Sequence, residues 1–389
     1  MATMKVRHII RRSLLMTVVA ALLTGCDMIK EDRDDCPTGL YVNFVYDYNI
    51  QRADMFKDHV GSVTLYVFDE SDKLVAQRTV SGSELSVYGC NIHFTEQELA
   101  PGHQYRLSAV GLQKDWDEAL ATKGAKYRKT TLDIGDSRQQ LGVALDRHSQ
   151  LANPTYFDVS TEAPLDTLWH TLQVMTASAA NQPTATRYHE NAKGEPTTNA
   201  IQTVKLEKGV PTYATVSLIR DTNHLNLSLF ALASSGGGFE DIDVDDYEVF
   251  ILDANGDVDY QNTVVTPTDS LIYRPYAQWS IPVSEVDADE EIRSAHYDLM
   301  FNRLMYNTTT DKSAVLCVRK DGKNVAVLNL PYYLCMGRMA YEINNYQPQE
   351  YLDREYDYRL ELFLLNGSWA YVKIHVLSWS KRSDNLAFN

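Results

Sequence analysis

Apolar and polar residues alternate along most of the patterned segments of the chain. In residues 224–230, for example, Leu225, Leu227 and Leu229 alternate with polar side chains. Successive side chains of a strand point to opposite faces of a sheet, so a period of two is typical of a strand with one buried face. The pattern predicts strands at residues 40–46, 63–68, 105–109, 213–219, 224–230, 247–252, 315–318, 325–330, 358–365 and 371–379.

Turn-forming residues separate these predicted strands. Residues 69–73 and 254–257 have the composition of hairpin turns, since the Asn255-Gly256 pair tolerates the positive φ angles of a tight turn. Helical patterns are few: a short helical turn is expected at residues 95–100, before Pro101, and a short helix at residues 115–123. The sequence therefore predicts an all-β fold.

The chain after residue 25 is long enough for two domains. About 360 residues remain there, and a domain has on the order of 100–200. Residues 176–199 are rich in Ala, Thr, Asn and Pro and lack periodicity, which favours a linker. We therefore expect tandem β-sandwich domains at residues 36–200 and 201–389. The Ser-Ser-Gly-Gly-Gly run at 234–238 is short and is expected only to join strands.

The first 25 residues have the composition of a secretory signal peptide. Lys5, Arg7, Arg11 and Arg12 precede an apolar run at residues 13–23. This run is about half the roughly 20 residues that a membrane-spanning helix needs. Leu23-Thr24-Gly25-Cys26 resembles the bacterial lipobox, which predicts cleavage between Gly25 and Cys26 and a covalent lipid such as palmitate on the Cys26 thiol. The alternative is a buried apolar helix with a chance cysteine.

Charge excludes one class of partner. The full chain has a net charge of −16, and removing the four basic residues of segment 1–25 lowers it to −20. A chain this acidic is a poor match for nucleic acid, because phosphate binding needs a basic surface. The acidic stretch at residues 26–35 is expected to be a solvated tether; in lipoproteins of Bacteroidetes such a stretch resembles an export signal for the outer face of the outer membrane.

Four cysteines remain if Cys26 carries lipid. Four is an even number, which suits disulfides in an exported protein. Of the three possible pairings we expect Cys36 with Cys90 and Cys317 with Cys335, because each pair stays within one half of the chain. The alternative is four free, buried thiols.

Candidate chemistry is sparse elsewhere. The sequence lacks the G-x-S-x-G, P-loop, G-x-G-x-x-G and C-x-x-C motifs, and its ten histidines are scattered, so no enzyme, cofactor, metal site or small-molecule substrate is predicted. The acids Asp253, Asp257 and Asp259 have spacings that suit Ca²⁺, but the EF-hand glycine and glutamate are misplaced, and a hairpin turn is the preferred interpretation. Five tryptophans are candidates for glycan stacking or for core packing, with packing preferred: Trp116, Trp169, Trp279, Trp369 and Trp379.

A family resemblance emerges from several segments taken in chain order. They are CPTGLYVNFVYD (36–47), DMFKDHVGSVTLYVFD (54–69), LAPGHQY (99–105), DTLWH (166–170) and VSLIRDTNHLN (216–226). Together they resemble the FimB-type fimbrial anchor lipoproteins of Bacteroidetes, which are minor subunits at the base of surface fimbriae. The resemblance covers most of the chain and is strongest over residues 26–112.

The resemblance implies two transthyretin-like β-sandwiches and a non-catalytic role. Such a subunit attaches the fimbrial rod to the outer membrane, joins fimbrillin subunits by strand exchange and helps to regulate fimbrial length. Rod subunits lose an N-terminal strand to an arginine-directed cut, whereas here a cut at Lys30 or Arg33 would shed the lipid. We expect the segment at 371–379 to be the joining strand, with one face formed by Val372, Ile374 and Val376. The alternative for that segment is an ordinary core strand.

Two other functions remain open from the sequence alone. A surface adhesin or glycan-binding lipoprotein would need exposed aromatic side chains gathered on one face. A surface hydrolase would need carboxylates converging in a cleft.

Overall fold

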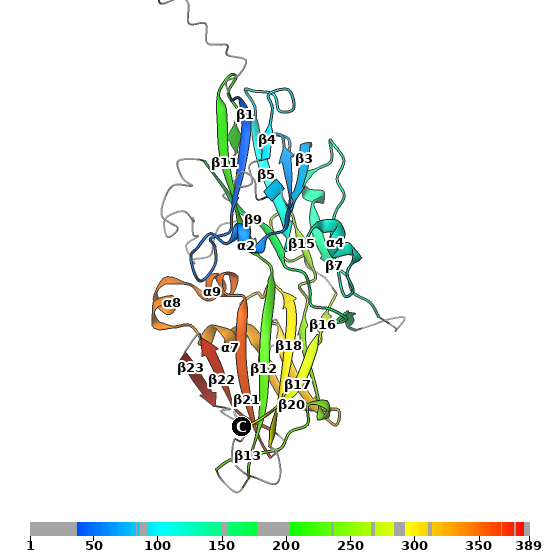
Figure 1. The fold of residues 1–389 in the computed structure, drawn as a ribbon, viewed down its shortest axis with the longest axis vertical. Helices are drawn as coiled ribbons and strands as arrows, with labels where there is room; N and C mark the ends of the chain where they lie inside the picture. Colours follow the sequence, from blue (N-terminus) through cyan, green and yellow to red (C-terminus); the bar gives the residue numbers. More distant parts are fainter. Residues whose placement is uncertain are drawn as a thin grey trace, which may run out of the picture.

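Two β-sandwich halves lie end to end along the long axis of the molecule (Figure 1). The structure is a computed structural model that describes residues 37–82, 84–85, 92–149, 155–176, 203–234, 237–265, 269–283, 292–309, 313–366, 368–376 and 379–384. The expected signal peptide, Gly25, Cys26, the acidic tether, Cys36 and Cys90 all lie outside these residues.

The N-terminal half is built on one strongly curved sheet. Its strands follow the order β3-β2-β5-β9-β11-β1-β4, with β10 beside β5, and β1 runs parallel to β11. Its inner face carries a separate apolar core that includes Leu40, Leu65 and Val216. The strands of this sheet are β1 (Gly39–Val45), β2 (Ser62–Phe68), β3 (Leu74–Ser81), β4 (Ile92–Phe94), β5 (Gln104–Leu112), β9 (Leu168–Thr176), β10 (Val204–Lys205) and β11 (Pro211–Arg220).

Strand β2 is buried on both faces. Val63, Leu65 and Val67 enter the inner core, whereas Tyr66 and Phe68 point to the other side and join a second core. A small sheet in the order β15-β7-β6 contributes Val258, Val143 and Tyr127 to that second core. Its strands are β6 (Tyr127–Lys129), β7 (Gly142–Leu145) and β15 (Asp257–Asp259).

Two facing sheets form the C-terminal half. One has the order β17-β18-β12-β21-β22-β23, with β13 beside β12, and the other has the order β20-β19-β14-β16-β8. Leu227 and Leu362 of the first sheet share a core with Ile251 and Leu316 of the second. The first sheet contains β12 (Thr222–Leu232), β13 (Phe239–Glu240), β17 (Ala277–Pro282), β18 (Arg293–Asn302), β21 (Asp357–Leu365), β22 (Ser368–Val376) and β23 (Trp379–Asp384). The second contains β8 (Phe157–Val159), β14 (Tyr247–Asp253), β16 (Leu271–Tyr273), β19 (Val315–Lys320) and β20 (Lys323–Asn329).

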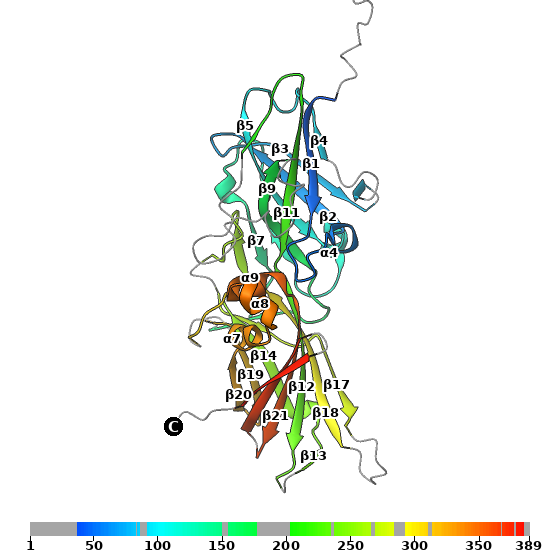
Figure 2. The same ribbon diagram turned by 90° about the vertical axis from the view of Figure 1, so that its left-hand side faces the viewer.

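Short helices complete the fold. The α2 helix (Phe56–His59) follows β1, and α4 (Trp116–Ala121) begins at Asp115, whose side chain accepts a hydrogen bond from the Asp117 N–H. Three further helices follow β20 and gather near the middle of the molecule: α7 (Leu330–Met336), α8 (Ala340–Asn345) and α9 (Pro348–Arg354). In Figure 2, α8 and α9 lie between the two halves. The α4 helix confirms the expectation at residues 115–123, whereas α2, α7, α8 and α9 were not expected.

The strand pairing places the boundary between the two halves at Asp221, not at residue 200. The expected boundary at residue 200 is wrong, because β10 and β11 both lie after it and pair with strands of the N-terminal sheet. Residues 176–199 were expected to link the domains. Thr176 ends β9, and residues 177–199 lie outside the described residues. The strands on either side of them, β9 and β11, are antiparallel neighbours in the N-terminal sheet. The actual crossing takes one residue, Asp221, between β11 and β12.

The two halves also exchange strands. Strand β8 pairs parallel with β16 of the C-terminal half, and β7 pairs antiparallel with β15. The second core accordingly runs without interruption from Tyr66 and Val110 to Leu360 and Ile374. The turn at 254–257 joins β14 to β15, which lie in different sheets. The prediction of a hairpin at this turn is therefore wrong. The buried Asn255 side chain donates instead to the carbonyls of Asn302 and Arg303.

A buried chain of polar groups spans the junction. Arg303 donates through Nε and Nη2 to the two carboxylate oxygens of Asp353 in α9, both at 2.7 Å. Its Nη1 donates to the Asn262 carbonyl at 3.1 Å. The Asn262 amide donates to Asp221 Oδ1 at 2.7 Å, and Asp221 Oδ2 lies 2.5 Å from His170 Nδ1 in β9. Burial opposes the charge on Arg303, yet the Asp353 carboxylate raises the pKa of Arg303.

Removing the Asp353 carboxylate from this chain of polar groups should destabilise the whole molecule. In the Asp353→Ala variant the Arg303 guanidinium stays buried without its carboxylate, and we expect a loss of about 3–5 kcal/mol in the free energy of unfolding. Denaturant unfolding followed by tryptophan fluorescence measures it.

The matched control is Asp146→Ala, which removes the exposed partner of Arg128 and should cost less than about 1 kcal/mol. The double variant Arg303→Met/Asp353→Leu should recover most of the loss, because no unpaired charge remains. Equal effects of Asp353→Ala and Asp146→Ala would contradict the assigned role.

Candidate functional site

The C-terminal strands are the first candidate site. Val372 is 0% exposed and Ile374 is 3% exposed, and both lie in the core opposite Leu362 and Leu360 of β21. Strand β22 is hydrogen-bonded on both sides, to β21 and to β23. The segment expected at 371–379 is therefore two strands: β22 ends at Val376, whose side chain is outside the described set, and Trp379 begins β23.

Strand β23 forms one edge of the C-terminal sheet. Among the described strands it pairs only with β22, in a register that places Val376 opposite Trp379 and Tyr371 opposite Asp384. An edge strand offers a row of backbone donors and acceptors to another chain. The outermost element at this end is thus β23, rather than the strand that carries Val372 and Ile374.

The expected bond between Cys317 and Cys335 is not formed. Both are buried, free thiols. Leu316 and Val318, on either side of Cys317 in β19, enter the second core, and Cys335 of α7 lies in that same core. Alternation along the strand turns Cys317 to the opposite face, so the two sulfurs lie on different sides of the sheet. Burial raises the pKa of both thiols, that of Cys335 to about 12.

The acidic turn after β14 uses its side chains in protein contacts. Asp257 accepts two hydrogen bonds from Arg147 Nη2, at 2.8 and 2.7 Å, and Asp259 accepts from the backbone N–H groups of Gln261 and Thr263. Asp253 has a buried carboxylate oxygen, and burial raises the pKa of its carboxyl to about 7. Within the described residues no group of three or more His, Cys, Asp or Glu side chains is arranged to hold a metal ion.

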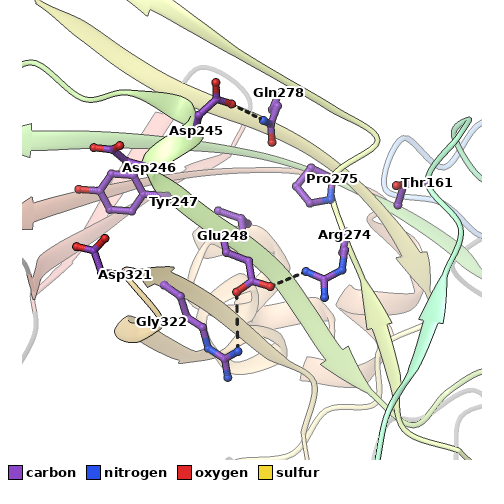
Figure 3. A pocket seen from close by; sticks show the side chains of 12 residues that line it. Thr161, Asp245, Asp246, Tyr247, Glu248, Arg274, Pro275, Gln278, Asp321 and Gly322 are labelled. Atoms are coloured by element: carbon purple, nitrogen blue, oxygen red, sulfur yellow. Dashed lines mark hydrogen bonds and ion pairs between the residues drawn. The ribbon is translucent and has the colours of Figure 1, made fainter. Parts of the chain in front are cut away.

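An open cavity of about 410 Å³ lies beside β14 (Figure 3). At its centre Glu248 pairs with Arg274 at 2.7 Å and with Arg319 at 3.9 Å. Asp245 accepts a hydrogen bond from Gln278, and Asp246 pairs with Lys320. Glu248 and Asp246 are thus paired with basic side chains, whereas Asp245 is held by a neutral amide.

A larger groove of about 680 Å³ lies where the two halves meet. Strands β12, β17, β18 and β21 supply its floor through outward-facing side chains, and loops of the N-terminal half supply one wall. We call it the junction groove. It is lined by Gln113, Pro164, Leu165, Thr167, Arg220, His224, Asn226, Tyr276, Trp279, Ile281, His296, Asp298, Met300, Tyr356, Asp357 and Arg359.

His224 organises the polar floor of the junction groove. Its Nδ1 lies 2.8 Å from Asp357 Oδ1, and its Nε2 lies 3.4 Å from Asp298 Oδ1. Burial opposes protonation of His224, but the two carboxylates raise its pKa overall. The hydrogen bond from His224 lowers the pKa of Asp357 in turn. The three groups therefore form a charged cluster across β12, β18 and β21.

The tryptophans divide between packing and the groove. Trp169 is 0% exposed, and Trp116 and Trp369 are half-buried against the second core, as the packing interpretation expects. Trp279 differs: it lies on the edge strand β17, stacks on His296 with ring centroids 5.7 Å apart, and lines the junction groove. The alternation of Ala277, Trp279 and Ile281 signals this outward face, but no strand was predicted there. The side chain of Trp379 is outside the described set.

Comparison with known proteins identifies the family. A family model described as the fimbrillin-A associated anchor proteins Mfa1 and Mfa2 matches residues 33–385. The chain belongs to this anchor family. Within the part of the chain that the structure describes, no helix is long and apolar enough to cross a membrane. No curated protein matches the chain.

Solved structures agree with the anchor-family fold. A candidate polysaccharide-binding protein from Bacteroides thetaiotaomicron is 26% identical, with 90% of this chain and 99% of that chain covered and a TM-score of 0.64. A candidate adhesin from the same organism is 25% identical, with 89% and 98% covered and a TM-score of 0.64. The fimbrial anchor protein Mfa2 from Porphyromonas gingivalis shares the fold at 16% identity, with 90% and 100% covered and a TM-score of 0.55.

Family membership confirms the resemblance drawn from the sequence. It assigns the chain to fimbriae at the cell surface, among proteins that associate with other fimbrial subunits in anchor or adhesin-like roles. These are structural proteins rather than enzymes. The β-sandwich architecture expected from the alternating pattern is confirmed as well.

Asp253 should give the folded protein a distinct pH dependence. Its folded pKa of about 7 lies above the unfolded value of 3.8, so the folded state holds the proton more tightly. The stability from this group is fully present below pH 3.8 and is lost as the pH rises through 7. We expect Asp253→Asn to be more stable than the wild type by about 4 kcal/mol at pH 8 and nearly equally stable near pH 4.

Urea unfolding at both pH values measures this difference. Asp321→Asn, at an exposed position, is the control and should leave the pH profile unchanged. A wild type that is the more stable protein at pH 8 would refute the assigned shift.

Proposed function

We propose that the protein is an outer-membrane lipoprotein that anchors a fimbrial rod at the cell surface. A lipid on Cys26 would hold it to the membrane, and its C-terminal strands would join a fimbrillin subunit. The observation that carries this proposal is the position of β23, which is both the last described strand and a sheet edge. The proposal includes the regulation of fimbrial length that the family resemblance implies.

The N-terminal strand supports an anchor that keeps its N-terminus. Strand β1 is hydrogen-bonded to β11 on one side and to β4 on the other. Leu40 and Val42 are 0% exposed in the inner core. Removing β1 would open that core, which supports a chain that keeps its N-terminal strand. The tether of residues 26–35 would then reach about 30 Å when extended, at roughly 3.3 Å per residue.

The C-terminal strands suit donation to a neighbouring subunit. An added strand gains affinity from main-chain hydrogen bonds and specificity from alternate side chains that fill pockets. Releasing β22 would also withdraw Val372 and Ile374 from the core, at about 2–5 kcal/mol each if they found no new pocket. Strand β23, which pairs only with β22 among the described strands, would leave first and is the strand offered to the partner.

Truncation tests the joining strand. We expect a chain that ends at residue 378 to fold, because both cores stay intact, but to lose its fimbrillin partner. Circular dichroism measures folding, and co-purification of fimbrillin with the outer-membrane protein measures attachment. A chain that lacks only residues 385–389 is the matched control and should keep the partner. Fimbrillin recovered equally with both folded truncations would exclude the C-terminal strand as the joining element.

Substitution of Cys26 tests the membrane attachment. We expect Cys26→Ala to leave the outer-membrane fraction, because the only proposed hydrophobic anchor is the lipid on that thiol. Cys317→Ala removes a buried thiol elsewhere and should stay with the membrane. Cell fractionation with immunodetection reads the result, and a Cys26→Ala protein that remains in the outer membrane would disprove lipid anchoring.

A further inference from the structure

We propose that the junction groove binds an uncharged oligosaccharide. This site goes beyond the anchoring function, because none of its residues belongs to the N-terminal tether or to the C-terminal strands. Pockets of about 300–1,000 Å³ at domain junctions are typical of small-ligand sites, and the groove has about 680 Å³.

The groove has an aromatic surface that matches the apolar face of a sugar ring. Trp279 stands on the edge strand β17, with one face of its indole parallel to the His296 imidazole at an interplanar angle of 15°. No described strand pairs with the outer side of β17, and the indole remains half-exposed. Tyr276 lies further along the same segment, 6.3 Å from the ring of His224. Such rings offer flat, rigid contact area to the axial C–H groups of a pyranose.

The polar side chains of the groove are held in fixed orientations. Asn226 donates to Asp298 Oδ1 at 2.8 Å, and His224 bridges Asp298 and Asp357. The contacts from Asn226 and His224 both go to Oδ1 of Asp298, so among the described residues Oδ2 keeps its capacity to accept. Carboxylate, amide and guanidinium heads are planar and present two hydrogen-bonding atoms side by side. Pairs of neighbouring sugar hydroxyls present the complementary arrangement.

The charges of the groove favour a neutral ligand. Arg220 and Arg359 balance Asp298 and Asp357, and His224 is shared between the two carboxylates. Arg220 is further committed to the Tyr356 ring, with its guanidinium carbon 3.9 Å from the centroid. The Asp298 carboxylate would repel a uronate or a phosphate, and the Arg359 guanidinium would repel a cationic ligand. Hydroxyl groups can donate to the acids and accept from the arginine, so a polyhydroxyl ligand satisfies both.

Direct binding tests the site. The probes are the neutral tetrasaccharides cellotetraose, maltotetraose, mannotetraose and chitotetraose, with anionic tetragalacturonate for comparison. Saturation-transfer NMR and calorimetry with the full chain in detergent should detect binding of at least one neutral probe and weaker or no binding of the anionic one. Failure of all four neutral probes to bind at millimolar concentration overturns the proposal, as does binding of the anionic probe alone.

Two variants locate the binding. Trp279→Ala removes the aromatic surface, and Asp298→Asn replaces one acceptor oxygen with a donor at constant shape; each should weaken binding at least tenfold. Trp116→Ala, in α4 and away from the groove, should bind like the wild type. Equal binding by the wild type and Asp298→Asn places the sugar elsewhere and overturns the proposal, even where Trp279→Ala fails to fold. Fimbrillin attachment should survive both groove variants, which separates this site from the anchoring function.

Discussion

The buried contact between Arg303 and Asp353, both in the C-terminal half, anchors a chain of polar groups that reaches the N-terminal half. It closes a polar chain that runs through Asn262 and Asp221 to His170, and so it ties helix α9 of one half to strand β9 of the other. Around it, β8 pairs with β16, β7 pairs with β15, and one apolar core crosses from half to half. Only Asp221 lies between β11 and β12, so no linker segment separates the halves. The junction groove is lined by residues from both halves.

The alternation of apolar and polar residues predicted where strands lie, but it did not predict which strands pair with each other. Period-two alternation located β1, β2, β5, β11, β12, β14, β19, β20 and β21 within a few residues, because a half-buried strand imprints its geometry on its own sequence. The domain boundary was wrong because β11 has the same alternation whichever sheet it joins. Its neighbours, β1 and β9, are set by pairing across the fold. Short strands such as β6 and β8 are too brief to show a period.

The candidate sites show the same limit. The even cysteine count and the position of each pair within one half suggested that Cys317 and Cys335 would pair. Alternation along β19 instead turns Cys317 away from the core that holds Cys335. The junction groove collects His224, Asp298 and Asp357 from three separate strands, and no spacing in the sequence relates them. The α7 and α9 helices did leave a signal that was missed: each has a proline in its first turn, and Asn329 caps α7. The family resemblance, by contrast, rests on the order of many segments, so it does not depend on the structural interpretation of any one of them.

The parallel pairing of β1 with β11 has a mechanical consequence. Both strands run from the free end of the N-terminal half toward the junction, and β11 continues into β12 (Figure 1). A pull that lifts residue 39 away from the C-terminal half therefore slides β1 along β11 instead of peeling it. Seven residue pairs, from Gly39 with Pro211 to Val45 with Ser217, then share the tension at once. Such loading in shear resists rupture far better than the opening of one hydrogen bond after another.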